Sequence, residues 1–135
     1  MSAVDAATQY VTGFCEGERI GEDTRDVLVL ILEELITNTI SHGRPDPASP
    51  IVVNLDRDGD HILLGYLDHG VVFDPLRDRP EPDLTATTER ATVGGMGWPL
   101  ILHFSDSVDY RREGDANSLH FVISVQAGKR EYTLG

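Results

Sequence analysis

VLVLILEELITNTISHG, residues 27–43, is the stretch that decides the fold, because it is an apolar helix whose last turns carry polar side chains. Positions 27, 31, 34, 38 and 41 recur in steps of four and three, so they share one helical face. That face begins with two β-branched apolar residues and continues with Glu34, Asn38 and Ser41. A charge on a core stripe is costly unless it is paired or meets a ligand. The polar end of this helix, with His42 beside it, is therefore the first candidate for a site.

Two helices are expected in the first third of the chain. Residues 2 to about 17 have helical spacing, and Gly17 and Gly21 suit the end of that helix and a short connection. Glu22, Asp23 and Thr24 then place acidic and capping residues at the start of the second helix.

The rest of the chain alternates strands with one more helix. Residues 51–68 are predicted to form two strands around a turn with Asp58-Gly59 at its tip, and residues 107–126 a second hairpin. Between them lie a long loop over residues 69–93 and a glycine-rich turn that enters a short helix within residues 94–106. This order predicts an α/β two-layer sandwich, with the helices on one face of a mixed, largely antiparallel sheet.

Length, charge and cysteine content limit the class of protein. The 135 residues fit a single domain, and the formal net charge of −12 argues against a nucleic-acid-binding or anionic-membrane surface. Cys15 is the single cysteine, which excludes an intrachain disulfide, and its neighbours favour a buried small residue over a nucleophile. No apolar run approaches the ~20 residues of a membrane span, and the N-terminus lacks a signal pattern. We therefore expect a cytoplasmic protein.

The first motif with chemical meaning is Glu34-x-x-x-Asn38. An amide oxygen is a suitable ligand for Mg²⁺, which takes few protein ligands and completes its shell with water and phosphate oxygens. A carboxylate one turn earlier could accept a proton from a hydroxyl that attacks the phosphate. The pattern is weak by itself, since a solvated helix edge would also produce it.

The second motif is Asp68-His69-Gly70, followed by Phe73, at the end of a predicted strand. A carboxylate at a strand end can accept a hydrogen bond from an exocyclic amine such as that of adenine, and glycine lets a ligand approach the backbone. Alone, Asp-x-Gly is an ordinary turn. His69 either lines a pocket or occupies a water-exposed turn position.

The third motif is Gly94-Gly95-Met96-Gly97, directly before the apolar residues of a short helix. Glycines at a helix start free backbone N–H groups to cradle a phosphate, with help from the helix dipole. A flexible linker is the plain alternative. The motif is neither a P-loop nor a dinucleotide-binding fingerprint, because the Lys-Ser/Thr pair is absent and the loop lies late in the chain.

The order of these motifs resembles the asparagine box and the two glycine boxes of the GHKL (Bergerat-fold) ATPase superfamily. Within it, the chain looks most like the anti-sigma factor serine/threonine kinases, on EELITNTISHG, LDHGVVFDP, GGMGWPLI and the closing VDYRREGDANSLHF. The resemblance covers roughly residues 3–125. It implies a histidine-kinase-like ATPase domain over residues 1–135.

The resemblance also implies roles for individual residues. Glu34 would be the general base, Asn38 would hold Mg²⁺, and Asp68 would bind the adenine amine of ATP. The implied nucleotide-binding set is Asn38, His42, Asp68, Gly70, Phe73, Gly94, Gly95, Met96 and Gly97. The implied partners are a sigma factor, which the protein would sequester, and a STAS-type anti-sigma factor antagonist, which it would phosphorylate on serine; a homodimer is left open.

Several positions depart from the family pattern. Kinases of this branch usually begin with a strand, whereas here a helix starts within a few residues of Met1, which puts dimerisation and sigma-factor binding in question. Val72 replaces the usual glycine or proline of the first glycine box, and Trp98 follows the last glycine of the second. Arg90 is either a phosphate contact or a solvated charge. The alternative function is a nucleotide-gated binding module that sequesters a partner without phosphotransfer.

Overall fold

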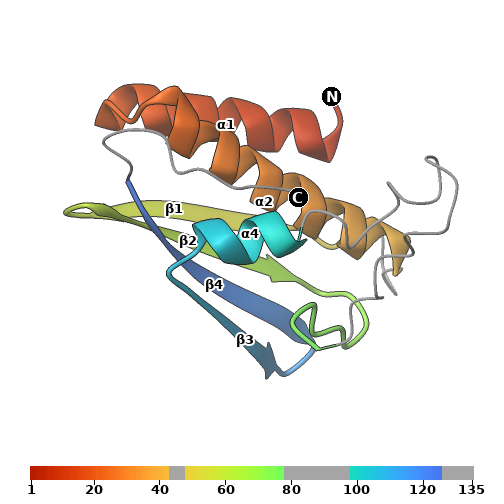
Figure 1. The fold of residues 1–135 in the computed structure, drawn as a ribbon. Coiled ribbons are helices and arrows are strands. Elements are labelled where there is room, and N and C mark those ends of the chain that lie inside the picture. Colours follow the sequence, from red (N-terminus) through yellow and green to blue (C-terminus); the bar gives the residue numbers. More distant parts are fainter. Residues whose placement is uncertain (43–47, 78–97, 126–135) are drawn as a thin grey trace, which may run out of the picture.

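The protein is an open antiparallel sheet covered on one face by helices, as seen in a computed structural model that describes residues 1–42, 48–77 and 98–125 (Figure 1). The sheet has four strands in the order β1-β2-β4-β3, and each neighbouring pair is antiparallel. The predicted two-layer α/β sandwich is thus confirmed. The elements are α1 (Ala3–Glu18), α2 (Glu22–Ser41), β1 (Val52–Asp58), β2 (His61–Asp68), α4 (Trp98–Phe104), β3 (Ser107–Glu113) and β4 (Ala116–Ser124).

The first helix ends one residue beyond the predicted glycine. α1 continues through Gly17, and Arg19 at its C-cap takes the left-handed conformation with φ of 58°. The Arg19 and Ile20 backbone N–H groups donate to the carbonyls of Glu16 and Cys15, which satisfies the last turn. The predicted helix end at about residue 17 is therefore correct to within one residue, and Gly21 lies in the short connection as predicted. The cap itself is a non-glycine residue, which these hydrogen bonds hold in the left-handed region.

Both hairpins form where the sequence predicts them. In the first, Asp58 pairs with His61, so the loop residues are Gly59 and Asp60, one position later than the predicted Asp58-Gly59 tip. Gly59 has a φ of 61°, a conformation that glycine adopts without strain and that therefore fixes the turn position. In the second hairpin, alternate residues of β4 (Leu119, Phe121 and Ile123) are buried, as the alternating pattern predicts.

The core lies between the sheet and the helices. Trp98, at the start of α4, is fully buried and stacks on Phe121 with ring centroids 6.3 Å apart. Cys15 is 2 % exposed, which agrees with the predicted small core residue, and burial raises the pKa of its thiol against a smaller opposing effect of Arg25. A thiol of this kind is a poor nucleophile.

The buried face of α2 differs slightly from the predicted one. Leu28, Leu32, Leu35 and Thr39 are each at most 6 % exposed and follow one another in steps of four, three and four. This face is offset by one residue from the predicted stripe, of which Ile31 and Asn38 are also buried and Ser41 is exposed. The offset matters for function, because it ends the core-facing stripe on the Thr39 hydroxyl.

Within residues 1–42, 48–77 and 98–125, no helix is long and apolar enough to cross a bilayer.

Candidate functional site

β2 ends at a buried carboxylate, Asp68, which is 7 % exposed. Its Oδ1 atom accepts hydrogen bonds from the Gly70 backbone N–H at 3.0 Å and from the Asn117 side-chain amide at 2.8 Å. Its Oδ2 atom accepts from the Thr39 hydroxyl at 2.7 Å. An ionised carboxylate has about four acceptor positions. These three bonds therefore orient Asp68 and leave one position, on Oδ2, for the donor of a ligand.

The α2 side of this carboxylate is a short chain of hydroxyl groups. Thr39 Oγ1 lies 2.6 Å from the Tyr66 hydroxyl and 3.0 Å from the Leu35 carbonyl oxygen, and the Tyr66 hydroxyl lies 3.2 Å from the same carbonyl. A hydroxyl has one proton to donate, and a carboxylate oxygen can only accept. The Thr39 proton therefore goes to Asp68, and the Tyr66 proton goes to Leu35 or to Thr39. The end of α2 is in this way bonded to the end of β2.

The sheet side of the carboxylate is organised by Asn117 on β4. Its Nδ2 group donates to Asp68 and to the Val71 carbonyl, both at 2.8 Å. Its Oδ1 atom accepts from the Tyr110 hydroxyl at 2.6 Å and from the Phe73 backbone N–H at 3.4 Å. One amide therefore links β2, β3, β4 and the segment that follows β2.

These groups line one pocket between α2 and the β2–β4 pair. Its volume is about 20 Å³, which is room for about one water molecule. A nucleotide base is larger, so its binding requires lining side chains to move. The lining residues are Leu35, Asn38, Thr39, His42, Tyr66, Asp68, Gly70, Val71, Phe73, Pro75, Asn117 and Leu119.

Two aromatic rings of this pocket are stacked on each other. His42, the C-cap of α2, and Phe73 have ring centroids 4.0 Å apart and an interplanar angle of 22°. His42 is exposed and Phe73 is half-buried, so both belong to the outer part of the pocket. Flat rings at a pocket edge suit a planar ligand, but their facing sides cover each other here, so such a ligand could stack only on an outer side or between separated rings.

Of the predicted general base Glu34 and the predicted metal ligand Asn38, only Asn38 lines the pocket. Asn38 lines it and is 8 % exposed, whereas Glu34, one turn earlier on α2, is half-buried and is not a lining residue. The structure therefore joins five of the predicted residues in one place: Asn38, His42, Asp68, Gly70 and Phe73. Gly94, Gly95, Met96, Gly97 and Arg90 lie outside the described residues.

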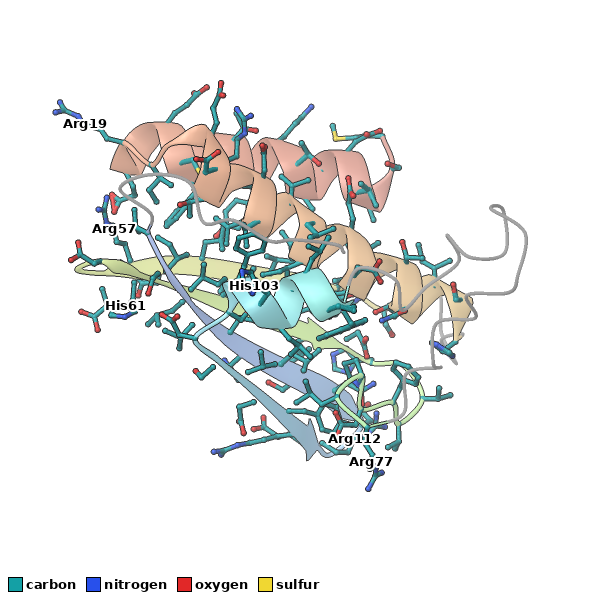
Figure 2. All side chains as sticks on the ribbon, in the orientation of Figure 1. Arg19, Arg57, His61, Arg77, His103 and Arg112 are labelled. Atoms are coloured by element: carbon teal, nitrogen blue, oxygen red, sulfur yellow. The ribbon has the colours of Figure 1, made fainter. Side chains whose placement is uncertain are left out.

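The segment after β2 is held from the outer strand. The Arg112 guanidinium on β3 donates from Nη1 to the Gly70 carbonyl at 2.8 Å, and Figure 2 shows Arg112 where β3 meets this segment. His69 lies outside the pocket lining and pairs with Asp115 through Nδ1 at 3.3 Å. Of the two interpretations of His69, the turn position is the one that the structure supports.

The donor set fits a cation that takes few protein ligands. Among residues 1–42, 48–77 and 98–125 there is no group of three or more histidine, cysteine, aspartate or glutamate side chains able to hold a metal. A side-chain amide such as that of Asn38 suits Mg²⁺ when phosphate oxygens and water supply the other ligands. The pocket would thus need the nucleotide to complete a magnesium site.

A larger hollow between α1, α2 and β1 has a different character. Its volume is about 510 Å³, and aliphatic, alanine and tyrosine side chains dominate its lining. Among the described residues that line it, none is charged, and the only polar side chains are those of Tyr10 and Ser49. The smaller pocket around Asp68 is therefore the candidate site.

Sequence reasoning missed three residues of this site: Thr39, Tyr66 and Asn117. Thr39 had a detectable signal, because it continues the apolar stripe of Leu28, Leu32 and Leu35. Tyr66 and Asn117 had none, because a tyrosine or asparagine on a strand is ordinary until the strand register places it beside a carboxylate.

Comparison with known proteins places the chain in a family. Residues 1–123 match the family described as histidine kinase-like ATPase domain. The chain is also 29 % identical over 96 residues to the serine/threonine-protein kinase BtrW of Bordetella bronchiseptica, over 70 % of this chain and 67 % of that protein. The family match over residues 1–123 covers nearly all of the described residues, including the residues of α2, β2 and β4 that line the pocket.

Proposed function

The chain belongs to the histidine kinase-like ATPase domain family, and from this membership we propose that it is an ATP- and Mg²⁺-dependent protein serine/threonine kinase acting as an anti-sigma regulatory factor. Membership confirms the predicted GHKL resemblance, and the similarity to a serine/threonine-protein kinase agrees with the predicted branch. The observation that carries the proposal is the buried, three-times hydrogen-bonded Asp68 facing a pocket that Asn38 also lines.

The base of the nucleotide would bind at the Asp68 end of the pocket. The free acceptor position of Asp68 Oδ2 would take a hydrogen bond from the adenine amine, and Gly70 allows the base to approach the backbone. The rings of His42 and Phe73 would separate or shift to admit the base. The phosphates would then extend along α2 past Asn38.

Two side chains of α2 would act on the phosphates. Asn38 would hold Mg²⁺, which when bound neutralises phosphate charge. Glu34 would accept the proton of a substrate serine hydroxyl as its oxygen bonds to the γ-phosphorus and the bond to the β–γ bridging oxygen breaks, releasing ADP. A half-buried carboxylate on a rigid helix suits this task because its position is fixed.

We propose as the protein substrate a STAS-type anti-sigma factor antagonist, and as the sequestered partner a sigma factor. Phosphorylation of the antagonist would release it and leave the protein free to capture the sigma factor. The support for these two partners is the resemblance of the sequence motifs to the anti-sigma kinase branch.

A second candidate is a nucleotide-gated binding module that sequesters a partner without phosphotransfer. The position of Glu34 outside the pocket lining favours it. The two candidates agree on nucleotide binding and differ only in whether Glu34 reaches a substrate hydroxyl.

Phosphotransfer from radiolabelled ATP to a STAS-type antagonist separates them. The wild type should label a serine of the antagonist, and Glu34→Gln should lower the rate by about 100-fold or more, a typical loss for a general base, with ATP affinity within about threefold. Glu33→Gln is the matched control, because Glu33 is the exposed neighbour on the same helix. An unlabelled antagonist with intact ATP binding would leave the binding module as the function.

The metal assignment has its own test by isothermal titration. Asn38→Ala should abolish Mg²⁺-dependent ATP binding, whereas Asn54→Ala, an exposed amide on β1, should leave it intact. Equal affinities for Asn38→Ala and the wild type would show that Asn38 does not hold the metal.

A further inference from the structure

The hollow between α1, α2 and β1 has no part in the proposed mechanism. Its volume of about 510 Å³ is within the range of ligand sites. Two of its lining side chains reach the surface, since Ile40 is 59 % exposed and Tyr10 is 43 % exposed. Large side chains exposed around a hollow form an apolar surface, and removing such a surface from water is favourable. The hollow can therefore take up apolar groups of a partner.

One wall of the hollow is β1, which lies at an edge of the sheet. β1 pairs with β2 on one side, and none of the strands in the described part of the chain lies on its other side. The Leu55 N–H donates to the Tyr10 hydroxyl at 3.1 Å, so this N–H points away from β2. Every second residue of a strand directs its N–H and C=O to the same side. The backbone N–H and C=O of Val53 therefore face the open edge, beside the hollow.

Side chains occupy the next two donors along this edge. The Tyr10 hydroxyl accepts from Leu55, and the Asp56 carboxylate accepts from the Arg57 N–H at 2.8 Å. Groups of this kind protect an edge strand from pairing with another chain. No side chain among the described residues accepts from the Val53 N–H. The edge of β1 is thus open to a further strand at its first residues and closed beyond them.

The geometry of strand pairing determines which side chains a further strand would bury. Residues directly opposite each other in an antiparallel pair place their side chains on the same face of the sheet. The side chains of Ile51 and Val53 line the hollow. The residues of an added strand opposite these two would therefore extend into the hollow, and the residue between them would lie on the other face. In this mode of recognition the backbone hydrogen bonds give affinity, and the hollow selects apolar side chains at alternate positions.

The charge of the surrounding elements indicates what flanks those apolar positions. Over residues 1–42 and 48–58, which include α1, α2 and β1, aspartate and glutamate outnumber arginine by ten to three, and there is no lysine. An acidic surface attracts a basic partner and raises its rate of association. Since the described lining of the hollow carries no charge, the basic residues of the partner belong beside the inserted side chains.

We propose that the open edge of β1 and the adjoining hollow are a docking site for an extended segment of a partner protein. The segment pairs with β1 at Val53, carries apolar residues at alternate positions and is flanked by lysine or arginine. The hollow shares no lining residue with the pocket around Asp68, so the inference does not depend on nucleotide binding.

The probe for this site is a fluorescently labelled synthetic peptide with valine at alternate positions, threonine between the valines and lysine at both ends. Fluorescence anisotropy should give a Kd of roughly 10–100 μM with the full-length protein, as expected of a small interface. A peptide of the same composition with its valines adjacent should bind at least about tenfold more weakly, because only every second side chain enters the hollow. Failure of the alternating peptide to bind, or equal affinities for the two peptides, would overturn the inference.

Amide hydrogen exchange separates strand pairing from general apolar adhesion. The bound peptide should slow exchange of the Val53 N–H by about tenfold or more, because this group gains a hydrogen bond. The Val52 N–H faces β2 already, so its exchange should be unchanged. Binding of the peptide without added protection at Val53 would contradict the proposed pairing.

Two lysine substitutions test the hollow itself. Ile40→Lys places a charge at its exposed rim and should weaken peptide binding by about tenfold or more. Val52→Lys is the matched control, because it adds the same charge at a residue that is 41 % exposed and does not line the hollow. Its effect should stay below about threefold, and equal losses for the two variants would overturn the inference.

Sedimentation of the protein alone tests the other occupant, a second copy of this chain. A dimer that Ile40→Lys dissociates would assign the hollow to self-association and overturn the inference of a partner segment, whereas a monomer that binds the alternating peptide supports it. No nucleotide is present in these measurements. A protein that binds the peptide but no ATP would therefore overturn the proposed function alone.

Discussion

The two ends of the β2–β4 ladder carry similar chemical groups in very different surroundings. At one end Asp68 pairs in register with Asn117, and at the other His61 pairs with Ser124. Each end has a carboxylate that accepts from a hydroxyl: Asp68 from Thr39, and Asp106, just before β3, from Ser124. Asp68 lines the pocket between α2 and the β2–β4 pair, and Asp106 does not.

Burial separates these two ends. The Asp106 side chain is 35 % exposed, and its ion-pair partner His61 is 50 % exposed with Nε2 at 3.7 Å. Asp68 is 7 % exposed and its three donors come from three different parts of the chain. Figure 2 shows His61 with Arg57 at one end of the sheet and Arg112 with Arg77 at the other. Water can replace a lost partner at the His61 end, whereas at the Asp68 end a lost partner leaves an unsatisfied buried group.

The two ends of the ladder should differ most in how their carboxylates, Asp68 and Asp106, respond to substitution. Asp68→Asn keeps one acceptor oxygen for the Gly70 and Asn117 donors but replaces Oδ2 with an NH₂ group, which then faces the Thr39 hydroxyl and the amine of the ligand. We expect a loss of about 2–3 kcal/mol in the free energy of unfolding and of about 100-fold or more in ATP affinity. Urea unfolding and isothermal titration measure the two quantities.

Asp106→Asn is the matched substitution at the other end. It should change the free energy of unfolding by less than about 0.5 kcal/mol and leave ATP affinity unaltered. Equal losses of stability for the two variants would show that burial does not distinguish the ends.

A smaller difference is expected for the hydroxyl donors. Thr39→Val keeps the shape of the side chain and removes one of the three donors to Asp68, so stability should fall by about 1–2 kcal/mol and ATP affinity by about tenfold. Ser124→Ala makes the corresponding change at the exposed end and should cost less than about 0.5 kcal/mol. If Thr39→Val left both stability and ATP affinity unchanged, Gly70 and Asn117 would be sufficient to orient Asp68.

The smallest effect is expected for the exposed ion pair. His61→Gln should lower the free energy of unfolding at pH 5.5 by about 0.5 kcal/mol or less, and about 1 M salt should remove the difference, because exposed pairs are screened. Urea midpoints at low and high salt measure this. A salt-independent loss of more than about 1 kcal/mol would contradict the assignment of this end as solvent-exposed and weakly coupled.

Fold class was predictable because it depends on periodicity, which is local. The alternating residues of β4, the apolar helical stripe and the two glycine turns each predict an element without reference to the rest of the chain. Errors occur where a local rule met a competing contact. Arg19 ends α1 in place of a glycine because the Glu16 and Cys15 carbonyls bond the cap, and the first hairpin turns at Gly59-Asp60 because its strand register requires that position.

The candidate site was predictable only in part. Asn38, Asp68 and Gly70 were found because they stand in motifs of fixed spacing, and the structure brings them together with His42 and Phe73. Thr39 was missed although it continues the buried stripe of Leu28, Leu32 and Leu35, and Tyr66 and Asn117 were missed because nothing in a linear pattern marks them. Their partners are 27 to 49 positions away in the chain.

By itself, the sequence determined the elements, their order and the residue types able to bind a phosphate, an amine or a metal, because each follows from side-chain chemistry and short-range spacing. Only the tertiary structure decided how Asp68 is used. The pairing of β2 with β4 and the packing of α2 on the sheet bring Asn117 and Thr39 to its two oxygens. Hydrogen bonds reach about 3 Å, so a contact of this kind exists only once long-range pairing has set the register.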